Sequence, residues 1–161
     1  MGTGSGCIAI TCFLENLSKQ IYATDISSDA LTVTRNNIQL HGADDIKVYH
    51  HNILKQGIKT RFDVVVSNPP YIAAEKIELL QEEVKNYDPK VALTDGDDGY
   101  VFYRRFAEIF DDLLNPGGYM LLEIGGNSHK IEVQKIFSNF GLKTIFFKDL
   151  QDDFRVVKVQ S

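Results

Sequence analysis

The fold of this chain is decided by one stretch, which reads Phe62-Asp63-Val64-Val65-Val66-Ser67 and continues as Asn68-Pro69-Pro70-Tyr71. Three consecutive valines predict a strand that is buried on both faces, as strands of a parallel sheet are. The two prolines that follow lack N–H donors and end the strand. Residues directly after such a strand lie where α/β folds place their chemistry. The stretch therefore predicts an α/β sheet with a functional loop at residues 68–71.

Strands and helices alternate on both sides of this stretch. Apolar spacing and turn residues predict helices over 7–17, from Ser27 or Ser28 to just before Gly42, and over 77–85, 100–114 and 128–140. Strands are predicted over 20–24, 46–50, 62–67, 119–124, 143–148 and 155–160, with a turn at 115–118. We expect the first helix to be buried. The order predicts an α/β fold with a mostly parallel sheet and a C-terminal antiparallel hairpin.

A glycine loop, Gly2-Thr3-Gly4-Ser5-Gly6, leads into the first predicted helix. Glycines let a ligand approach the backbone, and a helix N-terminus offers it N–H groups. Asp25 lies at the end of the next predicted strand, where a carboxylate can accept both hydroxyls of a ribose. The loop reads Gly-x-Gly-x-Gly rather than the Gly-x-Gly-x-x-Gly of NAD-binding loops, which favours S-adenosylmethionine over NAD. A flexible turn and a helix-capping aspartate are the alternative interpretations.

Two residues after the next predicted strand are candidates for binding an adenine ring. Ile53 can pack on the face of the ring, and the side-chain oxygen of Asn52 can accept a hydrogen bond from its amino group. A solvated polar turn with one core isoleucine explains the same residues equally well. The sequence leaves both interpretations of this pair open.

Asn68-Pro69-Pro70-Tyr71 suits a planar nitrogen that bears two N–H bonds. Such a nitrogen is a poor nucleophile because its lone pair is delocalised. The Asn68 side-chain oxygen and the Pro69 carbonyl can each accept one N–H, which orients the nitrogen and stabilises the positive charge that develops on it. Tyr71 can lie against the plane of the group. The alternative is a proline-rich turn without a chemical role.

The composition is that of one globular domain of 161 residues, with 43% hydrophobic and 24% charged residues. The sequence lacks a membrane span, a secretory signal and a metal-binding motif, so we expect a cytoplasmic monomer. Cys7 and Cys12 are expected to be reduced core thiols. The net charge of -5 argues against a broad nucleic-acid interface.

Taken together, these motifs resemble the release-factor glutamine methyltransferase (HemK/PrmC) family over essentially the whole chain. Beyond the glycine loop, Asp25 and the Asn-Pro-Pro-Tyr loop, the resemblance rests on three segments: Asp88-Pro89 with Ala92-Leu93 and Asp98-Gly99; Glu123-Ile124-Gly125; and Lys148-Asp149-Leu150 with Arg155-Val156-Val157. Asn52 departs from the family, which usually has an acidic residue there.

The resemblance implies a Rossmann-like class I methyltransferase fold and S-adenosylmethionine as the cofactor. It implies methylation of the glutamine amide in the Gly-Gly-Gln motif of class I peptide chain release factors, with no direct nucleic-acid partner. Residues 2–6, Asp25, Asn52, Ile53 and Asn68 would contact the cofactor, and Asn68, Pro69, Pro70 and Tyr71 would hold the substrate glutamine.

The family's N-terminal helical domain and first strand have no counterpart in residues 1–161, which we interpret as the catalytic domain. Because that strand is central in the family's sheet, we expect the strands around Asp25 to separate from the other four. We also expect this chain alone to fold poorly and to have little activity, as a fragment, a mis-started reading frame or part of a split gene would. An adenine amino-methyltransferase and a non-catalytic remnant are the alternative functions.

Overall fold

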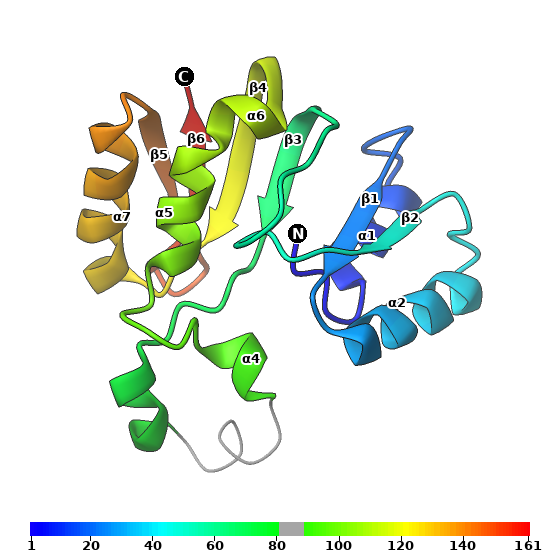
Figure 1. Cartoon of the computed structure of the whole chain (residues 1–161), viewed down its shortest axis with the longest axis horizontal. Coiled ribbons are helices and arrows are strands. Elements are labelled where there is room, and N and C mark those ends of the chain that lie inside the picture. Colours follow the sequence, from blue (N-terminus) through cyan, green and yellow to red (C-terminus); the bar gives the residue numbers. More distant parts are fainter. Residues whose placement is uncertain (81–88) are drawn as a thin grey trace. The chain divides into compact units, whose positions relative to one another are not determined.

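The computed structural model describes residues 1–80 and 89–161 (Figure 1). The chain forms two compact units, residues 1–57 and residues 58–161. The described strands form two sheets, one with the order β1-β2 and one with the order β3-β4-β6-β5. The predicted α/β class, the C-terminal antiparallel hairpin and the separation of two strands from four are confirmed.

In the first unit, two helices accompany a parallel pair of strands: α1 (Cys7–Leu14), β1 (Tyr22–Asp25), α2 (Ser28–Leu40) and β2 (Lys47–His50). The Ser27 hydroxyl caps α2 by accepting a hydrogen bond from the Ala30 N–H at 3.2 Å. The buried face of α2 carries Leu31, Thr34 and Ile38. Ile38 joins Ile10, Ala23, Ala43 and Ile46 in the core of this unit.

The prediction that the first helix is buried is wrong. Helix α1 ends at Leu14, and Ile10 is its one fully buried residue. Ala9, Ile10 and Phe13 pack on the core at helical spacing, so the remaining apolar side chains of α1 face outward. Cys7 is exposed and Cys12 half-buried; both thiols are free, but they are not core residues as predicted.

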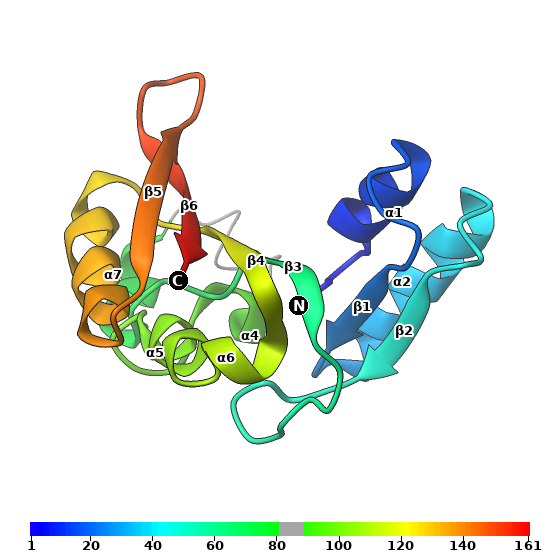
Figure 2. The same cartoon turned by 90° about the horizontal axis from the view of Figure 1, so that it is seen from above.

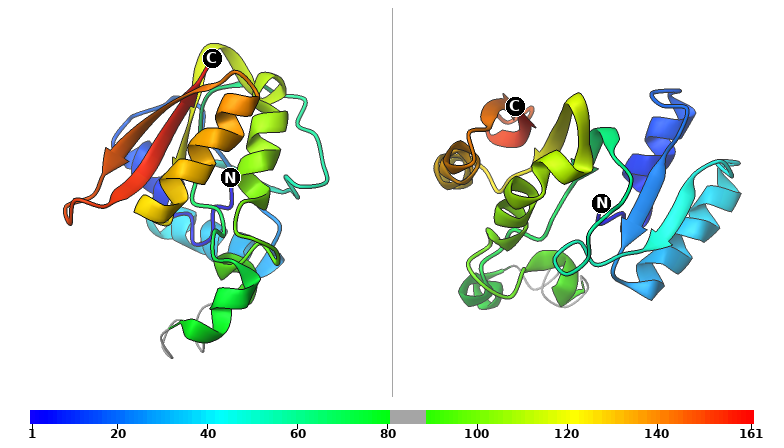
Figure 3. Two further views of the ribbon diagram at one scale, coloured as in Figure 1. Left: turned by 90° about the vertical axis from the view of Figure 1, so that its left-hand side faces the viewer. Right: turned by 45° about the horizontal axis from the view of Figure 1, so that its top comes forward.

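The second unit is a four-stranded sheet with helices on one face. Its elements, in chain order, are β3 (Phe62–Ser67), the 3-10 helix η1 (Ala74–Leu79), α4 (Lys90–Leu93), α5 (Val101–Glu108), α6 (Phe110–Leu113), β4 (Leu114–Glu123), α7 (Asn127–Asn139), β5 (Lys143–Lys148) and β6 (Phe154–Gln160). Strands β3 and β4 are parallel, whereas β6 is antiparallel to both β4 and β5. Figure 2 shows the projecting β5-β6 hairpin, and Figure 3 shows α5 and α7 side by side over the sheet.

Strand β3 has the predicted bounds but not the predicted burial on both faces. Val65 and Ser67 lie on one face and are buried, whereas Val64 on the other face is 41% exposed. Residues 115–118 do not form a separate turn but a bulge inside β4. The register shows this, because it pairs Phe62 with Leu114 and Val64 with Tyr119.

Two predicted helices differ from those observed. The helix predicted over 100–114 is divided into α5 and α6, with a break at Ile109. The helix predicted over 77–85 overlaps the observed η1, which begins and ends earlier. Residues 81–85 of the predicted helix lie outside the described residues, as does Asp88.

Candidate active site

The glycine loop is held by α2 and β1 within the first unit. The Thr3 N–H donates to the Thr24 carbonyl at 2.9 Å, which ties the loop to the end of β1. Gly6 caps α1 with a φ of 86°. A Cβ at this position would approach Thr34 Cγ2 to 3.0 Å. Glycine is therefore required at position 6 for both its backbone conformation and the close approach of α2.

Asp25 joins the glycine loop to the start of α2. One carboxylate oxygen accepts the Gly4 N–H at 2.9 Å, and the other accepts the Ser27 N–H at 2.9 Å. The carboxylate therefore contacts the start of α2, as the alternative interpretation of a helix-capping aspartate expects. It also orders the glycine loop. A carboxylate has about four lone-pair sites, so each oxygen can still accept one further hydrogen bond.

Two residues of α2 that the sequence reasoning did not assign hold the loop carbonyls. The Thr34 hydroxyl donates to the Gly4 carbonyl at 2.8 Å, and the Asn37 side-chain amide donates to the Ser5 carbonyl at 2.8 Å. Thr34 is fully buried on the apolar face of its helix. A polar residue on such a face is the signal that could have pointed to this contact.

The segment after β2 lies beside Asp25, because the His51 N–H donates to the Asp25 carbonyl at 2.9 Å. The Asn52 side-chain oxygen accepts the Leu54 N–H at 3.0 Å, and the Asn52 N–H donates to the Gln56 side chain at 2.8 Å. Asn52 is thus engaged in a local turn. Burial, followed by the charge of His50, lowers the pKa of His51.

In the second unit, Asn68-Pro69-Pro70-Tyr71 follows directly after β3, at its carboxyl end. Asn68 is exposed. Pro69 is buried and Pro70 is half-buried. The loop therefore has a buried proline at its base and presents one amide side chain to solvent.

Tyr71 is fixed from three sides. Its hydroxyl donates to a carboxylate oxygen of Glu123 at 3.3 Å. A Cβ on Gly125 would lie 3.1 Å from the Tyr71 ring, and a Cβ on Gly99 would lie 2.5 Å from the Tyr71 carbonyl oxygen. Burial, together with the negative charge of Glu123, raises the pKa of Tyr71. The phenol is therefore protonated at neutral pH.

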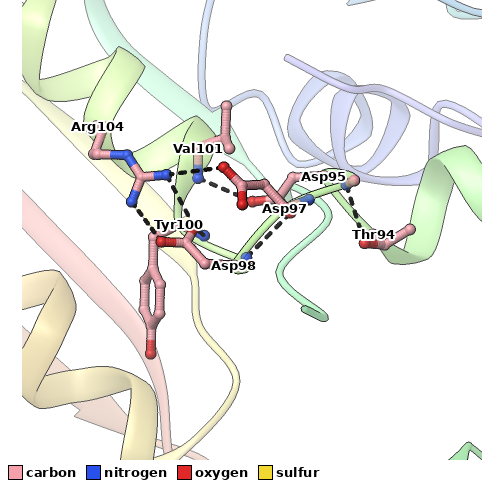
Figure 4. A network of polar contacts seen from close by, with 9 residues as sticks. Thr94, Asp95, Asp97, Asp98, Tyr100, Val101 and Arg104 are labelled. Atoms are coloured by element: carbon pink, nitrogen blue, oxygen red, sulfur yellow. Dashed lines mark hydrogen bonds and ion pairs between the residues drawn. The ribbon is translucent and has the colours of Figure 1, made fainter. Parts of the chain in front are cut away.

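An aspartate-rich loop at residues 94–101 is held together by polar contacts (Figure 4), and its Gly99 closely approaches the Tyr71 backbone. Asp95 accepts the N–H groups of Asp97, Gly99 and Val101 at 2.9, 3.1 and 2.9 Å. The Ala74 N–H donates to the Asp97 carbonyl at 2.8 Å. One carboxylate thus organises the loop, and the loop in turn positions the chain just after Tyr71.

The rings of Tyr71, Tyr100, Tyr103 and His129 form one aromatic cluster beside this loop. His129 in the first turn of α7 stacks on Tyr100, with 4.5 Å between ring centroids, and meets the Tyr71 ring edge-on at 5.6 Å. Buried Tyr103 donates its hydroxyl to the Glu123 carbonyl at 2.6 Å. The sequence reasoning assigned no role to Tyr100, Tyr103 or His129, and the helical spacing of Tyr103 was the one signal available.

The candidate residues fall into both units. Residues 2–6, Asp25, Asn52 and Ile53 belong to the first unit, where His51 and Thr34 bring the loop, the carboxylate and the adjacent turn together. Residues 68–71 belong to the second. The described part of the chain contains no group of three or more metal-binding side chains. No helix within it has the length and apolar character needed to cross a membrane.

Comparisons with known proteins give consistent results. The family model described as "Methyltransferase small domain" matches residues 1–97. A bifunctional methyltransferase of Rickettsia felis is 40% identical over 159 residues, which cover 98% of this chain and 30% of that protein. A release factor glutamine methyltransferase of Bacillus cereus is 39% identical over 151 residues, which cover 91% of this chain and 53% of that protein. The chain thus spans about half or less of the length of these curated relatives.

Solved structures share the arrangement of the chain at low sequence identity. A ribosomal protein L11 methylase of Lactobacillus delbrueckii subsp. bulgaricus superposes with a TM-score of 0.69 at 20% identity, covering 99% of this chain and 66% of its own. A methyltransferase of Pyrococcus furiosus gives a TM-score of 0.69 at 20% identity, covering 98% of this chain and 70% of its own.

Proposed function

The chain belongs to the methyltransferase small domain family and has the Rossmann-like fold of class I methyltransferases, and on that premise we propose that it methylates class I peptide chain release factors. The methyl group passes from S-adenosylmethionine to the side-chain amide nitrogen of the glutamine in the Gly-Gly-Gln motif. The relatives named release factor glutamine methyltransferase support this choice of substrate.

The first unit suits the proposed cofactor. A Cβ on Gly4 would meet nothing within 4 Å, so the loop backbone beside Asp25 is open to a ligand. Each Asp25 oxygen accepts one N–H and can accept one ribose hydroxyl as well. Residues 2–6 would line the nucleoside and methionine portions, with Ile53 against the adenine. Asn52 would contribute less, because its side-chain oxygen already accepts the Leu54 N–H.

The observation that carries the proposal is the exposed Asn68 amide at the carboxyl end of β3, beside a fixed Tyr71. The Asn68 oxygen and the Pro69 carbonyl would each accept one N–H of the substrate amide. Two acceptors hold the nitrogen in one orientation and favour the positive charge that develops as it is alkylated. Tyr71 would lie against the amide plane, and Pro70 would keep the loop rigid.

S-adenosylmethionine, when bound, supplies a methyl group activated by a sulfonium. The protein's part is to orient the amide and to exclude water, and no side chain has to ionise, because the surplus proton can leave the nitrogen after alkylation. The raised pKa of Tyr71 agrees with this, since a neutral phenol adds no charge beside the amide.

The proposal extends to the place of this chain in its longer relatives, its location and its oligomeric state. We place residues 1–161 within the catalytic part of the longer relatives and expect a cytoplasmic monomer that acts on a protein partner. Size-exclusion chromatography with light scattering checks the monomer, and a mass of two chains would contradict it.

The test is methyl transfer from labelled S-adenosylmethionine to a class I release factor, with a Gln-to-Ala release factor as the substrate control. The chain is assayed alone and extended by the residues encoded upstream of Met1. Asn68→Ala should lower transfer about 10²–10³-fold, as loss of one oriented polar contact to a transition state does, while cofactor binding persists. Label on the Gln-to-Ala substrate, or full activity of Asn68→Ala, would contradict the proposal.

A further inference from the structure

A pocket of about 830 Å³ opens beside Tyr71 within the second unit. Its walls come from the segment after the Asn-Pro-Pro-Tyr loop, from the aspartate-rich loop and from the start of α7. The residues that matter here are Tyr71, Glu75, Lys76, Asp97, Tyr100 and His129. Since Tyr71 belongs to both the pocket and the proposed amide site, a substrate bound at the amide site would pass its flanking residues into this pocket.

One wall of the pocket is aromatic. The Tyr100 and His129 rings stack with an interplanar angle of 29°, and Tyr71 closes the wall edge-on. Burial, and then the charge of Lys76, lowers the pKa of His129, although Asp95 and Asp98 act in the opposite direction. The imidazole is therefore neutral at pH 7, and the wall presents an uncharged π surface.

The rim of the pocket is acidic. Asp98 is already engaged, because both its oxygens accept hydrogen bonds from the Arg104 guanidinium at 2.8 and 2.9 Å (Figure 4). Asp97 is held more loosely, because its carboxylate lies 4.0 Å from the same guanidinium and its side chain is 72% exposed. Glu75 adds a further carboxylate, against one cation, Lys76, among the lining residues. A cationic ligand can therefore pair with Asp97 without displacing Arg104.

We propose that this pocket binds an arginine side chain of the protein substrate, close in sequence to the methylated glutamine. The inference rests on the proposed function for the identity of the substrate. A guanidinium is planar and weakly hydrated, so it can stack on the Tyr100–His129 wall and present N–H groups to Asp97 at the same time. A phosphate-bearing ligand would meet the carboxylates of Glu75, Asp97 and Asp98, which disfavours a nucleic-acid occupant.

The experiment measures binding by fluorescence anisotropy, so it does not depend on methyl transfer. Labelled peptides contain Gly-Gly-Gln and a single arginine placed in turn at each of the three positions before and after this motif. Matched peptides carry citrulline, which keeps the planar shape without the charge. We expect one arginine position to bind more tightly than its citrulline counterpart by about two- to fivefold, as an exposed ion pair and a cation–π contact allow.

Asp97→Asn should remove this preference, because it removes the charge and leaves the backbone contact to Ala74 intact. Asp111→Asn, an exposed aspartate on α6, is the matched control and should leave the preference unchanged. Tyr100→Leu should weaken binding of the arginine peptide more than that of the citrulline peptide. Equal affinity for arginine and citrulline at every position, or an unchanged preference in Asp97→Asn, would overturn the inference.

The two proposals fail separately. If the release factor is not methylated but the arginine preference depends on Asp97, the proposed reaction is wrong and the pocket assignment stands. If methylation of the glutamine is observed but arginine and citrulline bind alike, the reaction stands and the pocket has another occupant.

Discussion

Replacement of Gly99 by alanine tests how the Asn-Pro-Pro-Tyr loop is held in place. Gly99 has a φ of 88°, and an added Cβ would lie 2.5 Å from the Tyr71 carbonyl oxygen and 3.2 Å from the Ala73 nitrogen. Gly96, in the same loop, has a φ of 82°, and a Cβ there would meet nothing within 4 Å. The variants Gly99→Ala and Gly96→Ala therefore share the backbone strain of a positive φ, and only Gly99→Ala adds a close contact with Tyr71.

The expected magnitude follows from these distances. A left-handed conformation costs an alanine about 1–2 kcal/mol, which applies to both variants. The contact at position 99 falls 0.9 Å short of the ordinary 3.4 Å, and the group it meets is backbone, which cannot rotate away. Overpacking of this kind costs a further amount of about 1–3 kcal/mol. Gly99→Ala should therefore melt about 3–10 °C below Gly96→Ala.

Thermal unfolding followed by far-ultraviolet circular dichroism measures this difference. Both variants should melt below the wild type, with Gly99→Ala clearly the lower, and methyl transfer should fall more in Gly99→Ala because Tyr71 has to move. Equal melting temperatures of the two variants would refute the reasoning, since they would mean that the Tyr71 backbone yields without cost.

Two further predictions concern the first unit and the pH dependence of stability. Gly6→Ala should destabilise the chain by about 1 kcal/mol more than Gly42→Ala. Both glycines have positive φ, but only a Cβ at position 6 would meet a side chain, Thr34 Cγ2 at 3.0 Å. Equal urea midpoints of the two variants would contradict this prediction. The pKa of His129 is lowered from the ordinary 6.5, so the unfolded chain binds more protons and stability should fall as the pH falls below about 6.5. His129→Gln should flatten part of this fall between pH 7.5 and 5.5. His51, whose pKa is also lowered, and the N-terminal amine of Met1, whose pKa burial lowers to about 6, contribute in the same range. A wild-type slope in His129→Gln would show that the histidine does not contribute.

The fold was largely predictable because its signals are local. The capping serine and apolar stripe of α2 fix that helix, and the bounds of β3 and β5 agree with those predicted. Burial was less predictable, because it depends on neighbours that the pattern does not name. Helix α1 is apolar all round, yet only the stripe with Ile10 meets the core, and Val64 is exposed within a run of three valines.

The residues of the candidate site divide in the same way. The placement of Asp25 and Asn68 at the carboxyl ends of strands, where chemistry is expected, was predictable from the sequence. The residues that hold the neighbouring glycine loop and Tyr71 were not predictable, since their contacts span long stretches of sequence. Thr34 reaches Gly4 across 30 positions, and Glu123 reaches Tyr71 across 52. A helical pattern predicts that Thr34 faces inward, but not which carbonyl its hydroxyl meets.

The support around Tyr71 explains why the Asn-Pro-Pro-Tyr loop occurs together with motifs far along the chain. Glu123 binds the Tyr71 hydroxyl, Gly125 leaves room for its ring, and Gly99 leaves room for its carbonyl. These residues belong to Asp98-Gly99 and Glu123-Ile124-Gly125, segments that carried the family resemblance. An amide acceptor needs a surface fixed to within a fraction of an ångström, because misplacement of a reacting group lowers the rate steeply. The distant motifs therefore belong to the proposed substrate site, through the single tyrosine that they immobilise.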